Sequence, residues 1–263
     1  MSKEIVLIVS FISLFLWGCR DNKKAEKYRD ESFEKSKNKD YAGAIQLLEK
    51  ALSYEERDIV SMASWDSTLI NLAYLEWANE KYKNNDVQGA IELCNTVLKR
   101  DKYYCAAYGN RSFYREQLHD LEGALTDAEN YLAALTHNPF TNVGYYPSTG
   151  WKRRGDLNFA LGRYNTFLED YEKAATYATS DSLRADIYTT MANVAFDKLK
   201  DGKLILEYAD KAIQFNPNLS TPYLYRAIIY RAGKMKKEAC EAIHQYMRVS
   251  RDKDIKDLKS FCE

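Results

Sequence analysis

The chain has few of the residues that interrupt helices, with 11 glycines and 4 prolines among 263 residues. This scarcity excludes collagen-like and loop-rich low-complexity chains, and it favours helices joined by short turns. Lysine plus arginine and aspartate plus glutamate number 38 each, so no net charge draws the chain to nucleic acid or acidic substrates. We therefore expect a folded, mostly helical protein with no nucleic-acid partner.

Motifs for catalysis and metal binding are also missing. The sequence has no Gly-rich phosphate loop, no GxSxG elbow, no HExxH and no CxxC. Its three histidines, His119, His137 and His244, lack the spacing of metal ligands and are expected at the surface or at helix caps. The sequence therefore predicts a protein that is not an enzyme and that binds no cofactor or metal. A site assembled from distant residues is the alternative.

One long apolar run stands at the N-terminus. Ile5–Trp17 is 13 residues long, too short to span a bilayer comfortably. It ends in the letters LWGC, which resemble the lipobox of bacterial lipoproteins, a family in which the signal is cut before a cysteine that is then acylated. The resemblance implies a signal peptide at 1–18, followed at 19–24 by a lipidated Cys19 and a short tether, with several acyl chains giving a stable anchor. Arg20 resembles the residue found in lipoproteins sent to an outer membrane. An ordinary secretory peptide or a buried helix is the alternative.

Three segments repeat one pattern. They are DYAGAIQLLEKAL from residue 40, DVQGAIELCNTVL from residue 86 and DLEGALTDAENYL from residue 120. Each begins with an aspartate, which can cap the free amides of a helix N-terminus, and continues with apolar residues at a period of 3.6. Recurrence of this kind indicates a repeat protein.

From residue 25 to residue 250 the chain reads as six helix-turn-helix repeats and resembles the tetratricopeptide-repeat (TPR) family. In that family the first helix of each repeat begins with an aromatic residue, and here the corresponding positions hold Tyr28, Tyr74, Tyr108, Trp151, Thr189 and Tyr223. Two of the five spacings are 34 residues, the family period, and the longer ones imply insertions at Ser53–Asp66 and Thr136–Gly150 in turns between repeats. The resemblance implies an all-α, right-handed α-solenoid with a short capping helix in residues 251–263. Repeats four and five match the family pattern least, and an irregular fifth repeat is expected.

The same resemblance suggests a binding surface, because first helices line the concave groove of such proteins. The residues it points to are Asn79, Tyr82, Gly109, Asn110, Phe113, Lys152, Arg153 and Asp156. Such side chains could hold an extended peptide. Asn79, Asn110 and Arg153 match three of five residues with which some members clamp a C-terminal carboxylate, but Leu75 and Thr149 stand where lysines belong.

Charged residues at matching places in repeats three and four predict two structural ion pairs. Arg111 and Arg154 lie on first helices, and Asp127 and Asp170 lie on second helices. We expect Arg111–Asp127 and Arg154–Asp170 to set the register of their helices, with no catalytic role.

The cysteines are expected to differ in state. Folding two antiparallel helices about a turn near residues 251–252 places Cys240 level with residue 262 or 263, so a Cys240–Cys262 disulfide is expected under oxidising conditions. It would fix a final helix, 254–261, over the last repeat. Cys94 and Cys105 are expected to stay reduced and buried.

Aromatic residues of the second insertion, Phe140, Tyr145 and Tyr146, either form a binding surface or pack back on the repeats. Taken together, these features predict a membrane-anchored scaffold or adaptor in the bacterial cell envelope that binds a partner protein or peptide in its groove. The alternative is a sensor or solute-binding solenoid for a peptide or glycan fragment, which stacking by Tyr82, Phe113, Tyr145 and Tyr146 would favour.

Overall fold

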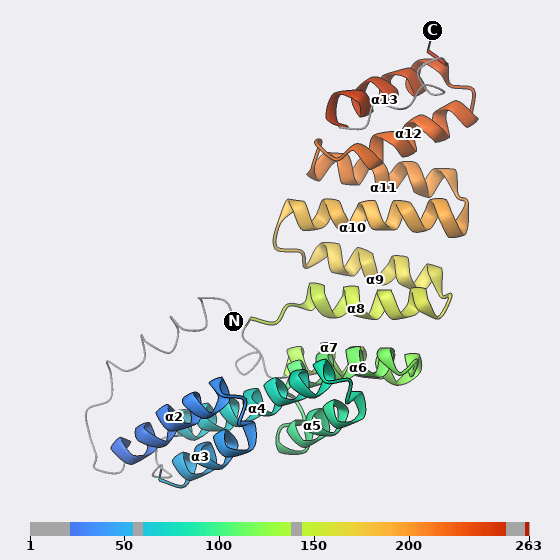
Figure 1. The fold of residues 1–263 in the computed structure, drawn as a ribbon. Helices are drawn as coiled ribbons and strands as arrows, with labels where there is room; N and C mark the ends of the chain where they lie inside the picture. Colours follow the sequence, from blue (N-terminus) through green and yellow to red (C-terminus); the bar gives the residue numbers. More distant parts are fainter. Residues whose placement is uncertain (1–21, 55–59, 138–143, 251–260, 263) are drawn as a thin grey trace. The chain divides into compact units, whose positions relative to one another are not determined.

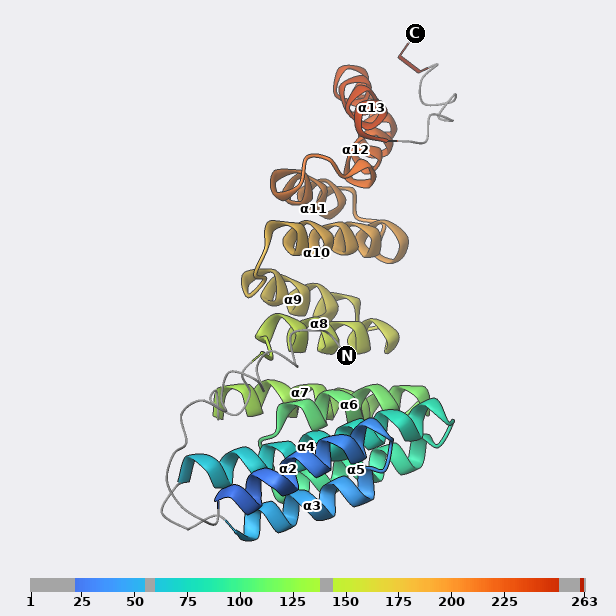
Figure 2. The same ribbon diagram turned by 60° about the vertical axis from the view of Figure 1, so that its left-hand side comes forward.

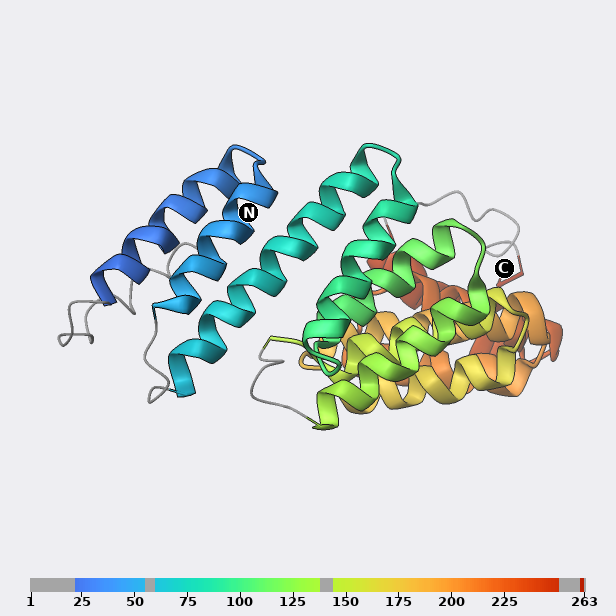
Figure 3. The ribbon, with the colours of Figure 1, turned by 90° about the horizontal axis from the view of Figure 1, so that it is seen from below.

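The computed structural model describes residues 22–54, 60–137, 144–250 and 261–262, which form helices and turns without a strand. The chain divides after Lys102 into two units, and Figure 1 labels the helices in chain order. The first unit contains α2 (Asn22–Lys37), α3 (Tyr41–Ser53), α4 (Val60–Lys83) and α5 (Val87–Arg100). Seen from below, these four helices lie side by side (Figure 3).

The second unit contains the remaining helices. They are α6 (Cys105–Gln117), α7 (Leu121–His137), α8 (Pro147–Ala160), α9 (Tyr164–Thr176), α10 (Asp181–Val194) with the π-helical turn η1 (Ala195–Leu199), α11 (Gly202–Phe215), α12 (Ser220–Ala232) and α13 (Lys236–Val249). From α8 onward the hairpins stack one on the next, as both Figure 1 and Figure 2 show. The described helices pair as six hairpins, which confirms the all-α repeat architecture.

The repeated Asp-x-x-Gly pattern builds the start of a second helix. Asp40 accepts a hydrogen bond from the Gly43 amide at 3.0 Å, and the Asp120 carboxylate accepts one from the Gly123 amide at the same distance. A Cβ atom on either glycine would overlap the carboxylate of the capping aspartate. Glycine therefore leaves room for the capping carboxylate in these hairpins, which is consistent with the two residues recurring together.

A left-handed residue ends the first helix of every hairpin. These residues, all with positive φ, are Lys39, Asn85, His119, Gly162, Lys200 and Lys234. In the third repeat the amide of Asp120 then donates to the carbonyl of Arg115 at 3.0 Å. This closure is typical of a helix C-terminus that turns sharply into the next element.

The two insertions differ from what the spacing predicts. We expected the residues before repeat two to lengthen a turn, but from Val60 onward they extend α4, which is 24 residues long. The second insertion is also partly helical, because α7 continues to His137 and α8 already begins at Pro147. Proline at the first helical position loses no hydrogen bond there, so it suits this start.

Repeat five is irregular, as predicted. Its first helix, α10, ends in the π-helical turn Ala195–Leu199. Asn193 stands where the other repeats have a small residue, namely Ser32, Ala78, Ser112, Gly155 or Ala227. Its Oδ1 accepts a hydrogen bond from the Tyr225 hydroxyl of α12 at 2.7 Å. The departure from the pattern therefore links this repeat to the next one.

Several predicted segments fall on residues that the structure does not describe. The signal peptide, Cys19 and the start of the tether lie outside the described residues, as does most of the expected capping helix. Phe261, which was expected to end that helix, lies in a turn together with Cys262. Within the described residues, no helix combines the length and the apolar character needed to cross a membrane.

Candidate functional site

The residues predicted to line the groove lie on three first helices. Asn79 and Tyr82 lie on α4 in the first unit, whereas Asn110 and Phe113 lie on α6 in the second. Lys152, Arg153 and Asp156 lie on α8, also in the second unit. Five of these seven residues therefore belong to the α6–α9 hairpins of the second unit.

Arg153 holds repeat four against repeat three. Its Nε donates to the Ser112 hydroxyl at 3.0 Å, and its Nη1 donates to the Glu116 carboxylate at 2.7 Å. The buried Ser112 hydroxyl in turn donates to the Ala124 carbonyl of α7 at 2.9 Å. The sequence did not predict this structural role, since the contact joins two repeats and has no counterpart in the spacing within one repeat.

Asp156 is also engaged within the protein. Lys152 Nζ lies 3.0 Å from its carboxylate, and the Tyr171 hydroxyl of α9 donates to the same carboxylate. Burial, followed by the negative charge of Asp156, raises the pKa of Tyr171, so the hydroxyl keeps its proton and remains a donor. Arg153 and Asp156 therefore stabilise the stack, while Phe113, 40% exposed, and the exposed Lys152 face solvent.

The structure brings together both predicted ion pairs. Arg111 donates to the buried Asp127 through Nε at 2.9 Å and Nη2 at 2.6 Å. Arg115, one turn further along α6, also reaches Asp127, at 3.0 Å. Two guanidinium groups thus compensate one buried carboxylate, and Arg115 was missed by the sequence argument.

The second pair has the same design. Arg154 donates to the buried Asp170 through Nε at 3.1 Å, and Asn158 donates to it through Nδ2 at 2.9 Å. Arg154 and Lys173 both lie over the Trp151 ring, 4.5 Å and 4.3 Å from its centroid. In both hairpins the residue four positions after the arginine, Arg115 or Asn158, also donates to the buried aspartate. This spacing could have been read from the sequence.

A third buried carboxylate belongs to the first unit. Arg29 of α2 donates to Asp66 of α4 through Nε at 2.6 Å and Nη2 at 3.0 Å, and Asp66 is fully buried. Asp66 falls in the segment expected to be a loop, so its role depends on the unpredicted extension of α4.

Aromatic residues of the second insertion pack only in part. The Tyr145 ring meets the Tyr131 ring edge-on with centroids 6.5 Å apart, and the Tyr131 hydroxyl donates to the Tyr146 carbonyl at 3.5 Å. The Tyr146 side chain itself is exposed. Phe140 lies outside the described residues.

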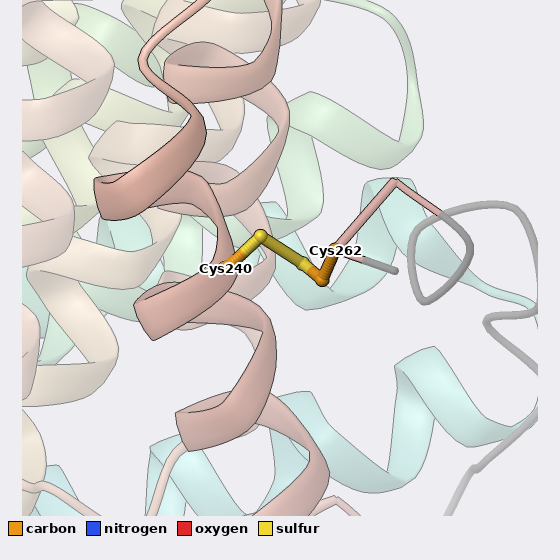
Figure 4. Close-up of a disulfide and its surroundings, with 2 residues drawn as sticks. All are labelled: Cys240 and Cys262. Carbon is orange, nitrogen blue, oxygen red and sulfur yellow. A yellow bond between two sulfur atoms is a disulfide. The ribbon is translucent and has the colours of Figure 1, made fainter.

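The Cys240–Cys262 pair expected from the sequence is joined by a disulfide, with Cα atoms 5.5 Å apart (Figure 4). Cys262 packs against the cluster of Ala227, Ala242 and Ile243, and Arg231 lies over the Phe261 ring at 5.5 Å. The end of the chain is thereby held against the last hairpin. Cys94 and Cys105 are buried thiols.

The histidines take no part in such clusters of contacts. His119 and His244 are exposed, and His137 stacks on Tyr103 at the end of α7. Across the described part of the chain, no group of three or more histidine, cysteine or acidic side chains is arranged to hold a metal ion.

Several known proteins are similar to this chain in sequence or in fold. No family model matches the chain. The TPR repeat-containing protein MJ1428 of Methanocaldococcus jannaschii is 25% identical over 229 residues, which cover 85% of this chain and 36% of that protein. The chain thus spans about a third of the length of the curated relative it matches.

Two solved structures are similar in fold. The C-terminal part of a TPR repeat-containing protein from Cytophaga hutchinsonii matches 99% of this chain and 94% of its own, with a TM-score of 0.60 and 16% identity. YrrB, described as a TPR protein with an unusual peptide-binding site, matches 78% of this chain and 93% of its own, with a TM-score of 0.51 and 14% identity. Together with the six hairpins and their repeated caps, these likenesses show that the chain has the helical-repeat fold of tetratricopeptide-repeat proteins.

Proposed function

We propose that this protein is a membrane-anchored scaffold in the bacterial cell envelope that binds a partner protein or peptide on its first helices. The observation that supports the proposal most is that some side chains of α6 and α8 bond within the stack and others are exposed. Arg153, Arg154 and Asp156 bond to neighbouring helices within the stack, whereas the Phe113 and Lys152 side chains are exposed, although Lys152 also pairs with Asp156. A rigid frame with exposed side chains loses little entropy when it binds a partner.

Two further features support the envelope location. The LWGC segment supplies a cysteine for lipid attachment at the end of an apolar run. The Cys240–Cys262 disulfide suits an oxidising compartment, since cytosolic thiols are kept reduced. The peptide-binding site named for YrrB supports a peptide or protein as the ligand class.

The partner is tested by pull-down from detergent-solubilised membranes. We expect wild type to retain one protein in stoichiometric amount, and Phe113→Ala/Lys152→Ala to lose it. Leu118→Ala, which removes an exposed apolar side chain from the α6–α7 turn, is the matched control and should retain the partner. Equal retention by all three proteins would refute binding through α6 and α8.

The anchor is tested separately by fractionation. Cys19→Ser should move the protein from the membrane to the soluble fraction, because the acyl chains are lost. Unchanged membrane retention would refute lipidation while leaving partner binding open.

A sensor or solute-binding role is the second candidate, favoured by the exposed Phe113 and Tyr146 rings. It predicts a rise in melting temperature with short peptides or glycan fragments and no stoichiometric protein in the pull-down. A protein partner without such a rise would exclude it.

A further inference from the structure

Helix α4 carries an apolar stripe along the edge of its core, where Leu69 packs against a buried cluster that includes Ile70 and Ala73. Trp65, Leu69, Leu72 and Glu76 follow one another at spacings of four, three and four, which places them on one face of the helix. Trp65 is 41% exposed and Leu72 is 37% exposed. An exposed helix face is ordinarily polar, so large apolar side chains in this arrangement call for a partner.

Phe33 of α2 extends the stripe. Two ion pairs, Arg29–Asp66 at 2.6 Å and Lys39–Glu80 at 2.6 Å, align α2 with α4. By this register Phe33 lies level with residues 70–74 of α4. It follows Arg29 by one turn, so it lies on the flank of α2 nearest α4, and its side chain is 48% exposed.

Glu76 places an uncompensated negative charge in this apolar surface. It is only partly exposed, and the described residues offer it neither a hydrogen bond nor an ion pair. Burial raises the pKa of its carboxyl group. Glu80, one turn further on, shows the contrast, because its hydrogen bond from Lys39 lowers the pKa of that carboxyl.

We propose that the α4 stripe, defined as Phe33, Trp65, Leu69, Leu72 and Glu76, docks a segment of the partner protein that combines apolar side chains with a lysine or arginine. The apolar groups cover the exposed Phe33 and Trp65 rings and the Leu72 side chain, and the cation pairs with Glu76. This inference rests on the proposed function, for which it names the chemistry of the partner.

Charge decides between a peptide and a lipid surface as the occupant. An anionic membrane would bring more negative charge toward Glu76, which is repulsive. A cationic segment instead supplies the missing counter-charge where the carboxylate is partly desolvated, and such complementarity gives specificity. The geometry therefore favours a basic, apolar segment.

The experiment uses the full-length protein in detergent and three sets of labelled synthetic peptides. The peptides are about twelve residues long, share one pattern of leucine and tryptophan, and carry lysine, glutamine or glutamate at the remaining positions. Binding to wild type should rank lysine, glutamine, glutamate, with about a tenfold difference in Kd between the first and the last.

The variants make the assignment specific. Glu76→Lys should reverse the ranking, and Trp65→Ala/Leu72→Ala should weaken binding of all three sets. Leu118→Ala should bind as wild type does, since Leu118 is comparably exposed in the second unit. Because the substituted side chains are exposed or half-exposed, the melting temperatures should stay close to that of wild type, and this is checked first.

An unchanged ranking with Glu76→Lys would overturn the proposal. Binding to anionic lipid vesicles that requires Trp65 and Leu72, with no peptide preference, would also overturn it. If the pull-down partner is lost with Phe113→Ala/Lys152→Ala but kept with the α4 variants, the proposed function stands and the stripe does not. If the protein retains no partner and binds no peptide, both fail.

Discussion

At the scale of single residues, glycine decides how closely the helices approach. Gly155 of α8 faces Tyr171 of α9, and an added Cβ would lie 2.7 Å from that ring and 3.3 Å from the Asp170 Cβ. At Gly109 of α6 the nearest atoms of Tyr131 would be 3.5 Å away, an ordinary contact. Two glycines in equivalent helices are therefore required to very different degrees.

Gly155→Ala should destabilise the protein by about 1–3 kcal/mol, because the methyl group overpacks a rigid contact. Gly109→Ala should instead stabilise it by about 0.5–1 kcal/mol, since alanine is the better helix former. Urea unfolding of both variants checks the opposite signs. A gain in stability for Gly155→Ala would show that α8 and α9 are not packed as described.

Buried carboxylates are the second determinant at this scale. Asp170→Ala leaves the Arg154 guanidinium without its counter-charge and should cost about 3–5 kcal/mol in free energy of unfolding. Glu122→Ala breaks an exposed pair with Arg163 and should cost about 0–1 kcal/mol. Denaturant titrations compare the two, and equal losses would contradict the structural role of Asp170.

Sequence reasoning reached the main ion pairs and caps within a repeat, although it missed Arg115 and Asn158, and it missed the contacts that join repeats. The Asp120 cap and the Arg111–Asp127 pair lie inside one hairpin, so their spacing repeats along the chain. Arg153 reaches Glu116 in the preceding repeat, and the angle between repeats is set by packing that no local pattern encodes. Its assignment to the groove was therefore incomplete.

At the scale of helices, α9, α10 and α11 share a mixed charged and aromatic cluster. Lys211 lies 2.8 Å from Glu172 and 3.0 Å from Glu207, and its ammonium group lies over the Tyr188 and Tyr208 rings. Burial, reinforced by the nearby glutamates, raises the pKa of Tyr208 to about 12. Burial alone would lower the pKa of Lys211, but its hydrogen bonds and its attraction to the two glutamates raise it overall.

These shifts predict alkaline unfolding. A group with a raised folded-state pKa stabilises the fold fully below its unfolded pKa, and this stabilisation is lost as the pH rises through the folded value. For Tyr208 the window runs from about pH 10 to about pH 12. The free energy of unfolding should fall across it, and less steeply in Tyr208→Phe.

Urea titrations at stepped pH provide the measurement. Tyr177→Phe, which removes the hydroxyl of an exposed tyrosine at the end of α9, is the control and should keep the wild-type slope. Identical slopes for Tyr208→Phe and wild type would contradict the buried setting of Tyr208.

Helix boundaries show a further limit of sequence reasoning. The spacing of equivalent residues locates an insertion but does not say whether it is loop or helix. Residues from Val60 onward form the first turns of α4, and only because they do is the buried Asp66 paired with Arg29. The helical start of α4 and the Arg29–Asp66 pair both depend on packing between neighbouring hairpins.

At the scale of the whole molecule, a disulfide links the residues after α13 back to the last hairpin. The disulfide joins Cys262 to Cys240 of α13, and Cys262 packs against the buried cluster of Ala227, Ala242 and Ile243. At the other end, α2 begins at Asn22, within the segment predicted to be a tether, and the lipid anchor at Cys19 stays a prediction.

Removing the disulfide should lower the stability of the protein. Cys262→Ser is expected to cost about 2–4 kcal/mol, because the link closes a loop with a sequence separation of 22. Wild type in dithiothreitol should show the same loss, and Cys262→Ser should not respond further to the reductant. A full response of the variant to dithiothreitol would place the stabilising effect elsewhere.

Site-specific photocrosslinking in intact membranes tests the central claim most directly, namely that first helices bind a partner. A photoreactive residue would replace Leu72, Phe113 or Lys152 on first helices, or the exposed Glu129 or Glu169 on second helices. The account predicts crosslinks to one protein from the first-helix positions and none from the second-helix positions. Crosslinks confined to Glu129 and Glu169, or none from any position, would contradict it.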